Sequence, residues 1–400
     1  MSKAKLIPVL LAMILLIGCG STAEETQATT PSETTLPPTT QATQATEVTE
    51  PPTEESTEPP LVLDPGPDVF VNGIQLGGAV RDGETVYVNA NVFCTALGGT
   101  LNEDGTASFT KGETTYTFSS EYSHMMRNSK ALVLLSPVLN YQEQAYLPLE
   151  EICEFAELSV YIDPEYDDYY CTAAAWPRQV PEDYDVPVFM YHAVSNNTWG
   201  IDELFVMPER MEEQLKYLSE NGYDPIFFED LYHIEDYDKP VILTFDDGYE
   251  DNYTELFPLL KKYNVKATIF IITGYVNQPL YLTDQQILEM ADSGLVSIQS
   301  HTFSHPDLDE LSLEQQTSEL VDSKLHVTRL SRREPYVLCY PTGKYDSNTL
   351  SALEGVYAFG IKMRGGLYNT SDDSFLVNRY YVARQDTIYW FKATLEDIFD

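Results

Sequence analysis

Strand-like segments alternate with helical segments throughout the C-terminal half of the chain. Residues 241–245, 267–272, 297–300 and 336–340 are expected to be strands, with a helix between each strand and the next. Strands that are apolar on both faces need helices covering both faces, which is typical of a parallel sheet. The alternation therefore predicts an α/β domain over residues 186–400, with a closed or nearly closed barrel as the natural form of its sheet.

Polar side chains follow several of these strands at the point where each strand ends. The pair Asp246 and Asp247 ends one strand, His301 and His305 follow another, and His192 ends the first strand of the domain. In barrels of this type the catalytic residues emerge from the carboxyl ends of the strands. A lone Asp-Asp-Gly turn usually has only a structural role. The convergence of these groups on one face of the barrel instead predicts an active site.

These residues include the ligand types of a catalytic zinc site. Two neutral imidazoles and one carboxylate leave open positions on Zn²⁺ or a similar ion, and substrate and water need those positions. His301 and His305 stand four residues apart, and a helical turn would put both rings on one side. Neighbouring aspartates at a strand end point in different directions, so that one can bind the ion while the other faces the substrate.

The segments Thr244–Gly248 and His301–His305 resemble the first two motifs of the polysaccharide deacetylases, carbohydrate esterase family four. Enzymes of that family have a deformed (β/α) barrel and remove acetyl groups from chitin-like polymers, peptidoglycan or xylan. The resemblance, which extends over about residues 186–382, implies that Asp246 is the general base. It also implies that Asp247 and both histidines of the second motif hold a divalent metal, with zinc expected and cobalt, nickel or manganese as alternatives.

The third motif of the family usually reads Arg-x-Pro-Tyr-Gly, and here Cys339–Gly343 keeps the proline and the glycine but lacks the arginine. By the resemblance, the backbone N–H near Thr342 is expected to stabilise the oxyanion of the reaction. Another residue must then orient Asp246, and Arg379 is the candidate. The opening segment 190–192, Met-Tyr-His, resembles the subgroup that includes the exported poly-N-acetylglucosamine deacetylases.

The general acid has to come from an unusual place in this chain. Most relatives draw it from a Leu-x-His motif near the C-terminal end of the domain, whereas this chain has no histidine after His326. The first and last strands of a closed barrel are neighbours, so His192 at the end of the first strand is the predicted acid. The near-neutral pKa of an imidazole suits proton donation to a departing amine. The alternative is a histidine with only a structural role.

The predicted function is metal-dependent hydrolysis of acetyl groups on an extracellular polysaccharide that contains N-acetylglucosamine, or on peptidoglycan. Two alternatives stay open. A glycan-binding surface module with weak turnover is favoured slightly by the missing arginine of the third motif. An esterase that acts on O-acetylated glycan would use the same residues. Acetate release from N-acetylglucosamine oligomers, compared with release from acetylated xylan, separates these functions.

The first 19 residues predict export and membrane anchoring. Lys3 and Lys5 precede an apolar run over residues 6–17, which is too short for an ordinary membrane span and fits the core of a signal peptide. The run ends in Leu-Ile-Gly-Cys, which resembles the bacterial lipobox, so Cys19 is the predicted lipidation site. We therefore expect an extracytoplasmic lipoprotein on the bacterial cell membrane, with an ordinary signal peptide as the alternative.

Residues 20–65 have the composition of a disordered tether. Thr, Pro, Glu and Gln dominate there, so too little apolar surface is present to offset the entropy lost on ordering. The whole chain has 63 acidic and 23 basic residues, which gives a formal net charge of −40. This charge argues against nucleic acid as a partner. It is typical of a soluble, exposed surface, and a cationic polymer as substrate or product is the second interpretation.

Residues 66–178 are expected to form a small α+β domain, with a loose resemblance to stalk-like domains of bacterial surface proteins. A weak internal repeat aligns residues 87–94 with residues 146–153, and each copy reads as a short strand entering a helix. Cys94 and Cys153 fall at the same place in the two copies. This placement favours burial as small apolar residues over a disulfide or a metal site.

Overall fold

The computed structural model describes most of the chain beyond residue 60. The described residues are 61–102, 106–111, 114–118, 124–128, 130–156, 158–172 and 180–399. The predicted signal peptide, the lipidation site Cys19 and nearly all of the predicted tether therefore lie outside the described residues. Within the described ranges, no helix combines the length and the apolar character that crossing a bilayer requires.

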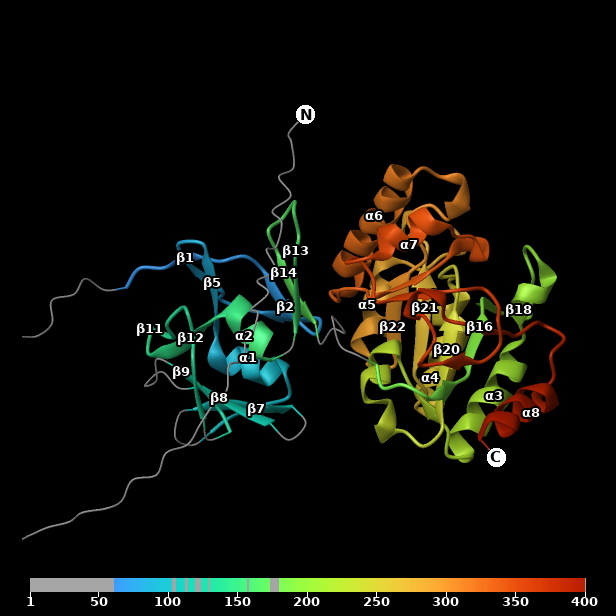
Figure 1. The fold of residues 1–400 in the computed structure, drawn as a ribbon, viewed down its shortest axis with the longest axis horizontal. Coiled ribbons are helices and arrows are strands. Elements are labelled where there is room, and N and C mark those ends of the chain that lie inside the picture. Colours follow the sequence, from blue (N-terminus) through green and yellow to red (C-terminus); the bar gives the residue numbers. More distant parts are fainter. Residues whose placement is uncertain are drawn as a thin grey trace, which may run out of the picture. The chain divides into compact units, whose positions relative to one another are not determined.

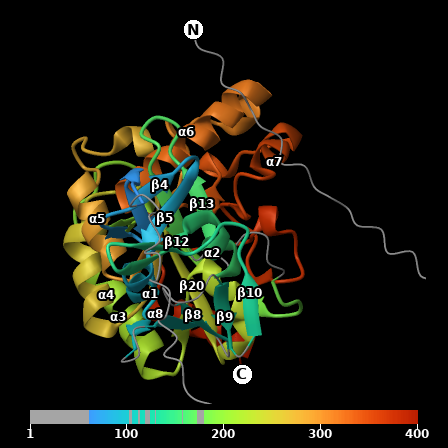
Figure 2. The same ribbon diagram turned by 90° about the vertical axis from the view of Figure 1, so that its left-hand side faces the viewer.

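Residues 61–172 form three small sheets and two short helices (Figures 1 and 2). The strands are β1 Asp64–Pro65, β2 Val69–Val71, β3 Ile74–Leu76, β4 Val80–Asp82, β5 Thr85–Asn89, β6 Thr100–Leu101, β7 Ala107–Lys111, β8 Thr114–Phe118, β9 His124–Arg127, β10 Lys130–Val133, β11 Leu139–Tyr141, β12 Gln144–Pro148, β13 Ser159–Ile162 and β14 Tyr169–Thr172. The helices are α1 Ala90–Ala96 and α2 Leu149–Phe155. The sheets have the orders β1-β4-β5-β12-β11, β10-β9-β8-β7-β6 and β13-β14-β2-β3. Helix α1 contacts strands of all three sheets, so that its buried residues join a common core.

The predicted internal repeat is present as two strand-to-helix units. Strand β5 runs directly into α1, β12 runs directly into α2, and the two strands pair in antiparallel register. The side chain of Asn89 caps α1 by accepting hydrogen bonds from the backbone N–H groups of Asn91 and Val92, which lack a helical acceptor. Cys94 and Cys153 are fully buried, and the four cysteines among the described residues are free. Their expected role as small apolar core residues is confirmed.

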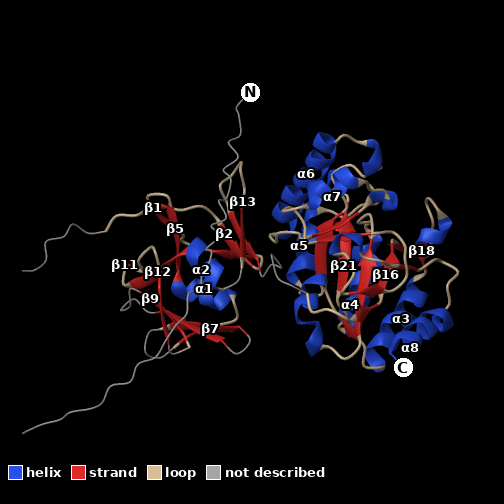
Figure 3. Ribbon diagram, in the orientation of Figure 1, coloured by secondary structure: helices blue, strands red, loops and turns tan. Residues whose placement is uncertain are grey.

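Residues 180–399 form a curled parallel sheet with helices on its outside (Figure 3). The strands are β15 Asp185–Val186, β16 Val188–Tyr191, β17 Ala193–Val194, β18 Phe205–Val206, β19 Asp224–Pro225, β20 Pro240–Phe245, β21 Ala267–Ile271, β22 Val296–Ser300, β23 Val337–Cys339, β24 Phe359–Ile361, β25 Tyr368–Asn369 and β26 Tyr380–Tyr381. The α-helices are α3 Pro208–Glu220, α4 Phe257–Tyr263, α5 Asp284–Asp292, α6 Leu313–Ser331, α7 Ser347–Leu353 and α8 Ile388–Phe399. The central sheet has the order β24-β23-β22-β21-β20-β16-β26, with β19 beside β20, and its pairings are parallel. The predicted α/β fold with a deformed barrel is confirmed.

The last strand brings the two edges of the sheet close to closure. Strand β26 pairs with β16, where Met190 lies opposite Tyr381. A few residues earlier, Val377 forms a parallel bridge to Ile361 of β24, at the other edge of the sheet. The segment 377–381 therefore bonds to both edges. The first and last strands are neighbours in a nearly closed barrel, as the alternation of strands and helices predicted.

Several of the helices that cover the sheet begin at residues that cap a helix N-terminus. Ser312 and Gln315 form a capping box at the start of α6, and a second capping box begins α5. The helix between β20 and β21 begins irregularly, because Asn252–Leu256 is a π-helical turn that leads into α4. Helix α8 was not anticipated from the sequence. Its apolar face is buried, and it lies beside α3 (Figure 1).

The two regions have separate hydrophobic cores. One core consists of buried residues between positions 69 and 171, and the larger clusters of the barrel consist of buried residues between positions 186 and 395. The boundaries of the expected domains, 66–178 and 186–400, stay a prediction.

Candidate active site

All seven residues predicted for catalysis and metal binding line one cavity at the carboxyl ends of the barrel strands. The cavity has a volume of about 420 Å³. The predicted residues that line it are His192, Asp246, Asp247, His301, His305, Thr342 and Arg379. They follow β16, β20, β22 and β23 or precede β26. Residues far apart in the sequence meet here because parallel strands of a barrel all end at the same rim.

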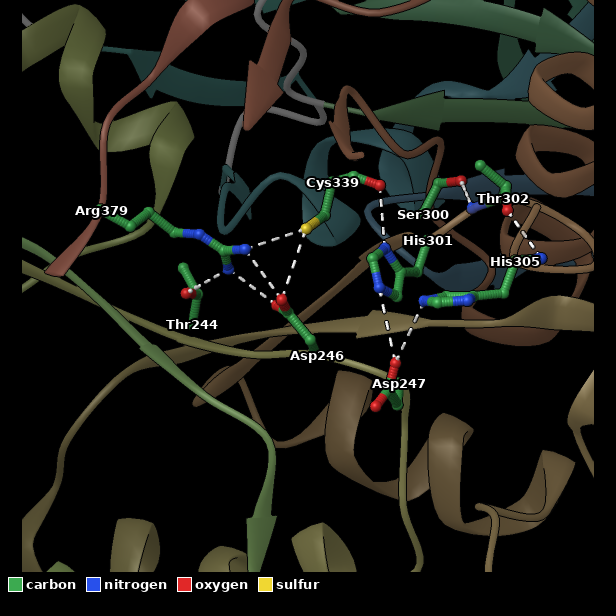
Figure 4. Close-up of polar contacts among 9 residues, drawn as sticks. All are labelled: Thr244, Asp246, Asp247, Ser300, His301, Thr302, His305, Cys339 and Arg379. Atoms are coloured by element: carbon green, nitrogen blue, oxygen red, sulfur yellow. Dashed lines mark hydrogen bonds and ion pairs between the residues drawn. The ribbon is translucent and has the colours of Figure 1, made fainter. Parts of the chain in front are cut away.

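Asp247, His301 and His305 face one another within a few ångströms (Figure 4). The Oδ1 of Asp247 lies 3.5 Å from the Nε2 of His301 and 3.7 Å from the Nε2 of His305. Ligands bonded to a tetrahedral ion at about 2.0 Å stand about 3.3 Å apart, so these three atoms already have nearly the required separation. The residues therefore fit a divalent metal such as Zn²⁺.

A hydrogen bond to the backbone orients His301 for this role. Its Nδ1 lies 2.8 Å from the carbonyl oxygen of Cys339. A carbonyl can only accept, so Nδ1 carries the proton and Nε2 keeps its lone pair toward Asp247. Such a partner sets both the tautomer and the ring orientation of a metal-binding histidine.

The backbone between the two histidines is not the helical turn that their spacing suggested. Thr302 and His305 both have left-handed conformations, with φ values of 64° and 60°. The hydroxyl of Ser300 accepts from the N–H of Thr302, and the hydroxyl of Thr302 accepts from the N–H of His305. This turn still brings the imidazoles of His301 and His305 together, with ring centroids 4.8 Å apart. The two imidazoles lie on the same side, as predicted, but a left-handed turn and not a helical turn brings them there.

A second group of ligand-type atoms, from Asp246, His301 and Cys339, also lies within 4.8 Å of one another. Arg379 disfavours a cation there, because its guanidinium donates to both the carboxylate of Asp246 and the sulfur of Cys339. Burial also raises the pKa of the Cys339 thiol. Within the part of the chain that the structure describes, the cluster around Asp247 is the one suited to a metal.

Arg379 holds Asp246 through two hydrogen bonds. Nη1 donates to Oδ1 at 2.7 Å and Nη2 donates to Oδ2 at 2.8 Å, and both residues are almost completely buried. Nη1 also donates to the hydroxyl of Thr244, and Nε donates to the carbonyl of Lys362. The guanidinium is thus fixed on several sides, and the structure brings Arg379 to the carboxylate that it was expected to orient (Figure 4).

The small side chain of Cys339 makes room for this arginine. Cys339 stands where the third motif of the family has its arginine, and its sulfur lies 3.2 Å from Nη2 of Arg379. A larger side chain at position 339 would collide with the guanidinium. The chain therefore supplies this guanidinium from the segment before β26 and not from the third motif.

Both aspartates are ionised in this setting. Burial alone would raise the pKa of Asp246, but the charge of Arg379 and its hydrogen bonds bring that pKa below the usual value. Burial also opposes ionisation of Asp247, and the nearby imidazoles lower its pKa. An ionised Asp247 can bind a cation, and an ionised Asp246 can accept a proton.

His192 lies in the cavity wall directly after β16. Its carbonyl accepts from the side chain of Asn252, and its Nδ1 is buried without a hydrogen-bond partner among the described residues. Burial lowers the pKa of His192, while the carboxylates of Asp246 and Asp247 counteract this effect in part. The ring is therefore held by packing and not by side-chain hydrogen bonds, which fits a role toward a bound molecule.

Thr342 lies in a tight turn at the edge of the cavity. It has a left-handed φ of 54°, and its hydroxyl donates to the carboxylate of Asp307, which follows the second motif. Gly343 is also left-handed, with a φ of 72°. This turn places the backbone of both residues on the cavity wall, where an N–H group can approach an oxyanion.

Other residues also line the cavity, and of these only Met190, Tyr340 and Gly343 belong to segments that the sequence singled out. They are Met190, Ile201, Glu203, Leu204, Tyr249, Tyr340, Gly343, Met363, Arg364 and Tyr381. Tyr381 has a detectable signal, because it stands two residues after Arg379 and alternate strand residues share a face. Ile201, Glu203 and Leu204 have no such signal, since they belong to a connection whose path depends on tertiary packing.

Comparison with known proteins assigns the family. Residues 233–357 match the family model described as polysaccharide deacetylase. Over 204 residues the chain is 35% identical to the putative polysaccharide deacetylase YxkH of Bacillus subtilis, covering 50% of this chain and 71% of that protein. It is 26% identical over 204 residues to the poly-beta-1,6-N-acetyl-D-glucosamine N-deacetylase of Staphylococcus aureus strain MSSA476, covering 45% of this chain and 66% of that protein.

A solved structure shows the same relationship. The Streptococcus pyogenes deacetylase PplD in complex with acetate has a TM-score of 0.51 and 29% identity, and the match covers 53% of this chain and 99% of that one. With the first relative covered over most of its length, the chain belongs to the polysaccharide deacetylase family. The resemblance that the first two motifs suggested is confirmed.

Proposed function

We propose that this protein is a metal-dependent hydrolase that removes N-acetyl groups from a polysaccharide containing N-acetylglucosamine. One observation carries the proposal: the triad of Asp247, His301 and His305 shares a cavity with the fixed pair of Asp246 and Arg379. The triad fits a Lewis-acid ion, and the pair provides an ionised base at a set position. Hydrolysis of an amide needs both.

Different groups of the cavity have different roles in the proposed reaction. When bound, the ion polarises the acetyl carbonyl and makes water a better nucleophile. Asp246, kept ionised and oriented by Arg379, accepts the proton of the attacking water. The backbone N–H near Thr342 donates to the oxygen on which negative charge develops. Acetate and a free amine are the products.

His192 provides the proton that the leaving amine needs. An amide anion is a very poor leaving group, so the nitrogen must be protonated as the C–N bond breaks. His192 is the imidazole of the cavity that lies outside the metal triad, and its Nδ1 has no partner among the described residues. It reaches the cavity from β16, the neighbour of the last strand β26.

The substrate class follows from the relatives and from the chemistry of the cavity. The Staphylococcus aureus relative is called a deacetylase of poly-beta-1,6-N-acetyl-D-glucosamine. Peptidoglycan is a second substrate that also carries N-acetylglucosamine. Export is supported by the signal-like segment at residues 6–17 and by the lipobox resemblance at Cys19, which would place the enzyme on the outer side of the cell membrane.

The experiment that tests the proposal is acetate release by Asp246→Asn. This variant is isosteric and keeps the three metal ligands, so it should retain the ion. It should lose about 10²–10⁴-fold in kcat, the usual contribution of a general base. Metal content by mass spectrometry and acetate release from N-acetylglucosamine oligomers are measured on the same preparations. Near-normal turnover, or loss of the ion, would show that the two aspartates are assigned in the wrong order.

The metal site has its own test. The protein should bind one divalent ion per chain, with zinc expected, and the double variant His301→Ala, His305→Ala should bind none. A double variant that purifies with full metal occupancy would rule out this site. His326→Ala serves as a matched control, because His326 lies on α6 and does not line the cavity.

Two other functions are distinguished by substrate. An O-acetyl esterase would release acetate from acetylated xylan and not from N-acetylglucosamine oligomers. A glycan-binding module without turnover would bind the oligomers and release no acetate from either substrate. The fixed position of Asp246 against Arg379 favours turnover over mere binding.

A further inference from the structure

A second, smaller cavity lies next to the catalytic one and has no role in the reaction described so far. It has a volume of about 190 Å³, and its polar lining comes from Ser195, Glu250, Asp251, Thr254 and Glu255. The indole of Trp199 also lines it and lies edge-on to the ring of Tyr249, with centroids 5.9 Å apart. Tyr249 lines the catalytic cavity. The two cavities therefore share the wall that these two aromatic rings form.

The charged residues that line the small cavity are all acidic. Three of its lining residues are carboxylic acids, and neither lysine nor arginine lines it. Asp251 is only 7% exposed. Its Oδ1 accepts from the backbone N–H of Val194 and from Nδ2 of Asn252, both at 3.0 Å. Its Oδ2 is buried and has no hydrogen-bond partner among the described residues.

A buried carboxylate oxygen without a partner is costly, so this group is suited to a ligand that brings a donor. Burial, with the nearby Glu255 and Glu250, raises the pKa of Asp251 to about 6. A bound cation would counteract all three effects, because it replaces lost hydration and offsets the like charges. The cavity is therefore built for a positively charged donor.

The geometry favours an ammonium group over a metal ion. Among the described residues, the groups of side chains close enough to hold a metal do not include these three carboxylates. An ammonium on a larger molecule needs no such tight cluster, since it donates up to three separate hydrogen bonds. Trp199, which is 37% exposed, offers an aromatic face to the ring of a sugar or to its charge.

We propose that this cavity binds the ammonium of a glucosamine unit that has already been deacetylated, while a neighbouring unit of the same polymer occupies the catalytic cavity. The proposal rests on the proposed function, because the reaction itself produces that amine. The enzyme would then prefer partly deacetylated chains and act faster as deacetylation advances. The formal net charge of −40 supports attraction of such a cationic polymer.

The test compares two oligomers of equal length: one fully N-acetylated, and one in which a single unit carries a free amine. The parent protein should show a higher kcat/KM on the second oligomer, by about tenfold, the size of one charge-assisted hydrogen bond. The double variant Glu250→Gln, Glu255→Gln removes two of the three acidic side chains and leaves Asp251 in place, so it should reduce this preference severalfold and keep its activity on the fully acetylated oligomer. High salt should reduce the preference of the parent protein. Equal kcat/KM on both oligomers would overturn the proposal.

A matched control removes the same two charges elsewhere. Glu84→Gln, Glu154→Gln alters exposed carboxylates that line neither cavity, and this variant should keep the preference. Direct binding of a fully deacetylated oligomer, measured by calorimetry, separates this proposal from the proposed function because it needs no turnover. Binding that is unchanged in the Glu250, Glu255 variant would exclude the subsite even in an active enzyme. Calcium binding that this variant loses, with oligomer binding unchanged, would identify a metal site instead.

Discussion

Arg379 is the residue whose surroundings do most to define the active site. It is 1% exposed, and its charge is balanced by the carboxylate of Asp246 through two hydrogen bonds. Removing one partner of such a buried pair leaves the other charge without compensation. The pair therefore matters for both stability and catalysis. The Asp246 carboxylate that compensates the buried charge of Arg379 is also the proposed general base.

Replacing Arg379 with alanine should lower the unfolding free energy by about 3–5 kcal/mol. The pKa of Asp246 should also rise, since burial is no longer opposed by the guanidinium. In the parent protein this depressed pKa adds stability above the ordinary pKa of an aspartate, and that stability is lost as the pH falls through the lowered value. The acidic limb of the kcat/KM profile should therefore move to higher pH in the variant. Urea denaturation and a pH–rate profile measure the two effects.

Two further variants serve as controls for the effects of Arg379→Ala. Arg210→Ala removes a surface arginine that pairs with Glu213 on α3, and it should change the unfolding free energy by less than about 1 kcal/mol. Arg379→Lys keeps the charge but loses the paired geometry, so it should fold better than Arg379→Ala and still have reduced kcat. An Arg379→Ala variant with parental stability and parental pH profile would show that the pair does not matter.

His192 should affect the chemical step and not metal binding. His192→Ala is expected to keep its ion and its affinity for the oligomer while kcat falls by about 10²–10⁴-fold on an N-acetyl substrate. Activity should recover in part on an aryl acetate, because that leaving group departs without a proton. Metal content and kcat on both substrates are measured together. An equal loss on both substrates would indicate a binding or folding role.

The covering helices depend on short signals at their ends. Helix α6 begins with a capping box, in which the Ser312 hydroxyl accepts from the N–H of Gln315 and the Gln315 side chain accepts from the N–H of Ser312. The buried face of α6 includes Leu320 and Val327. Helix α6 is therefore stabilised both by its capping box and by the packing of its buried face. Separate variants can measure how much each contributes to the stability of the protein.

Ser312→Ala should destabilise the protein by about 1 kcal/mol, the usual effect of losing an N-cap. The urea midpoint should fall while acetate release at low denaturant is unchanged, because Ser312 does not line the cavity. Ser318→Ala is the matched control. Ser318 is exposed within the same helix, where its hydroxyl donates to the carboxylate of Asp322. Alanine has the higher helix propensity and offsets the loss of this exposed hydrogen bond, so this variant should be close to neutral. Equal destabilisation by both variants would argue against a capping role.

For the whole molecule, anchoring is the prediction that most affects where the enzyme acts. Cys19→Ala should release the protein from the membrane fraction or leave the signal peptide unprocessed as a lipoprotein. The physical reason is that the predicted lipid on Cys19 is the anchor. Fractionation and electrophoretic migration measure the outcome. A variant that behaves like its parent would exclude the lipobox interpretation.

The sequence by itself determined the barrel and most of the candidate metal site. Apolar strands such as β20 and β21 can be recognised because they are buried along their whole length. The Asp246–Asp247 pair follows β20, and His301 follows β22. The local sequence is enough to place these residues, because a residue at the end of a parallel strand lies at the rim of the barrel where that strand ends. The capping box at Ser312 was recognisable for the same reason.

Only the tertiary structure decided how the remaining groups meet. The sequence offered Arg379 as a candidate, but its contact with Asp246 depends on β26 pairing with β16 and on the small side chain of Cys339. The left-handed turn at Thr302 and the small acidic cavity beside Trp199 were likewise not recognisable in advance. Such features arise from contacts between residues distant in the chain, and local propensity carries no information about which distant residues will meet.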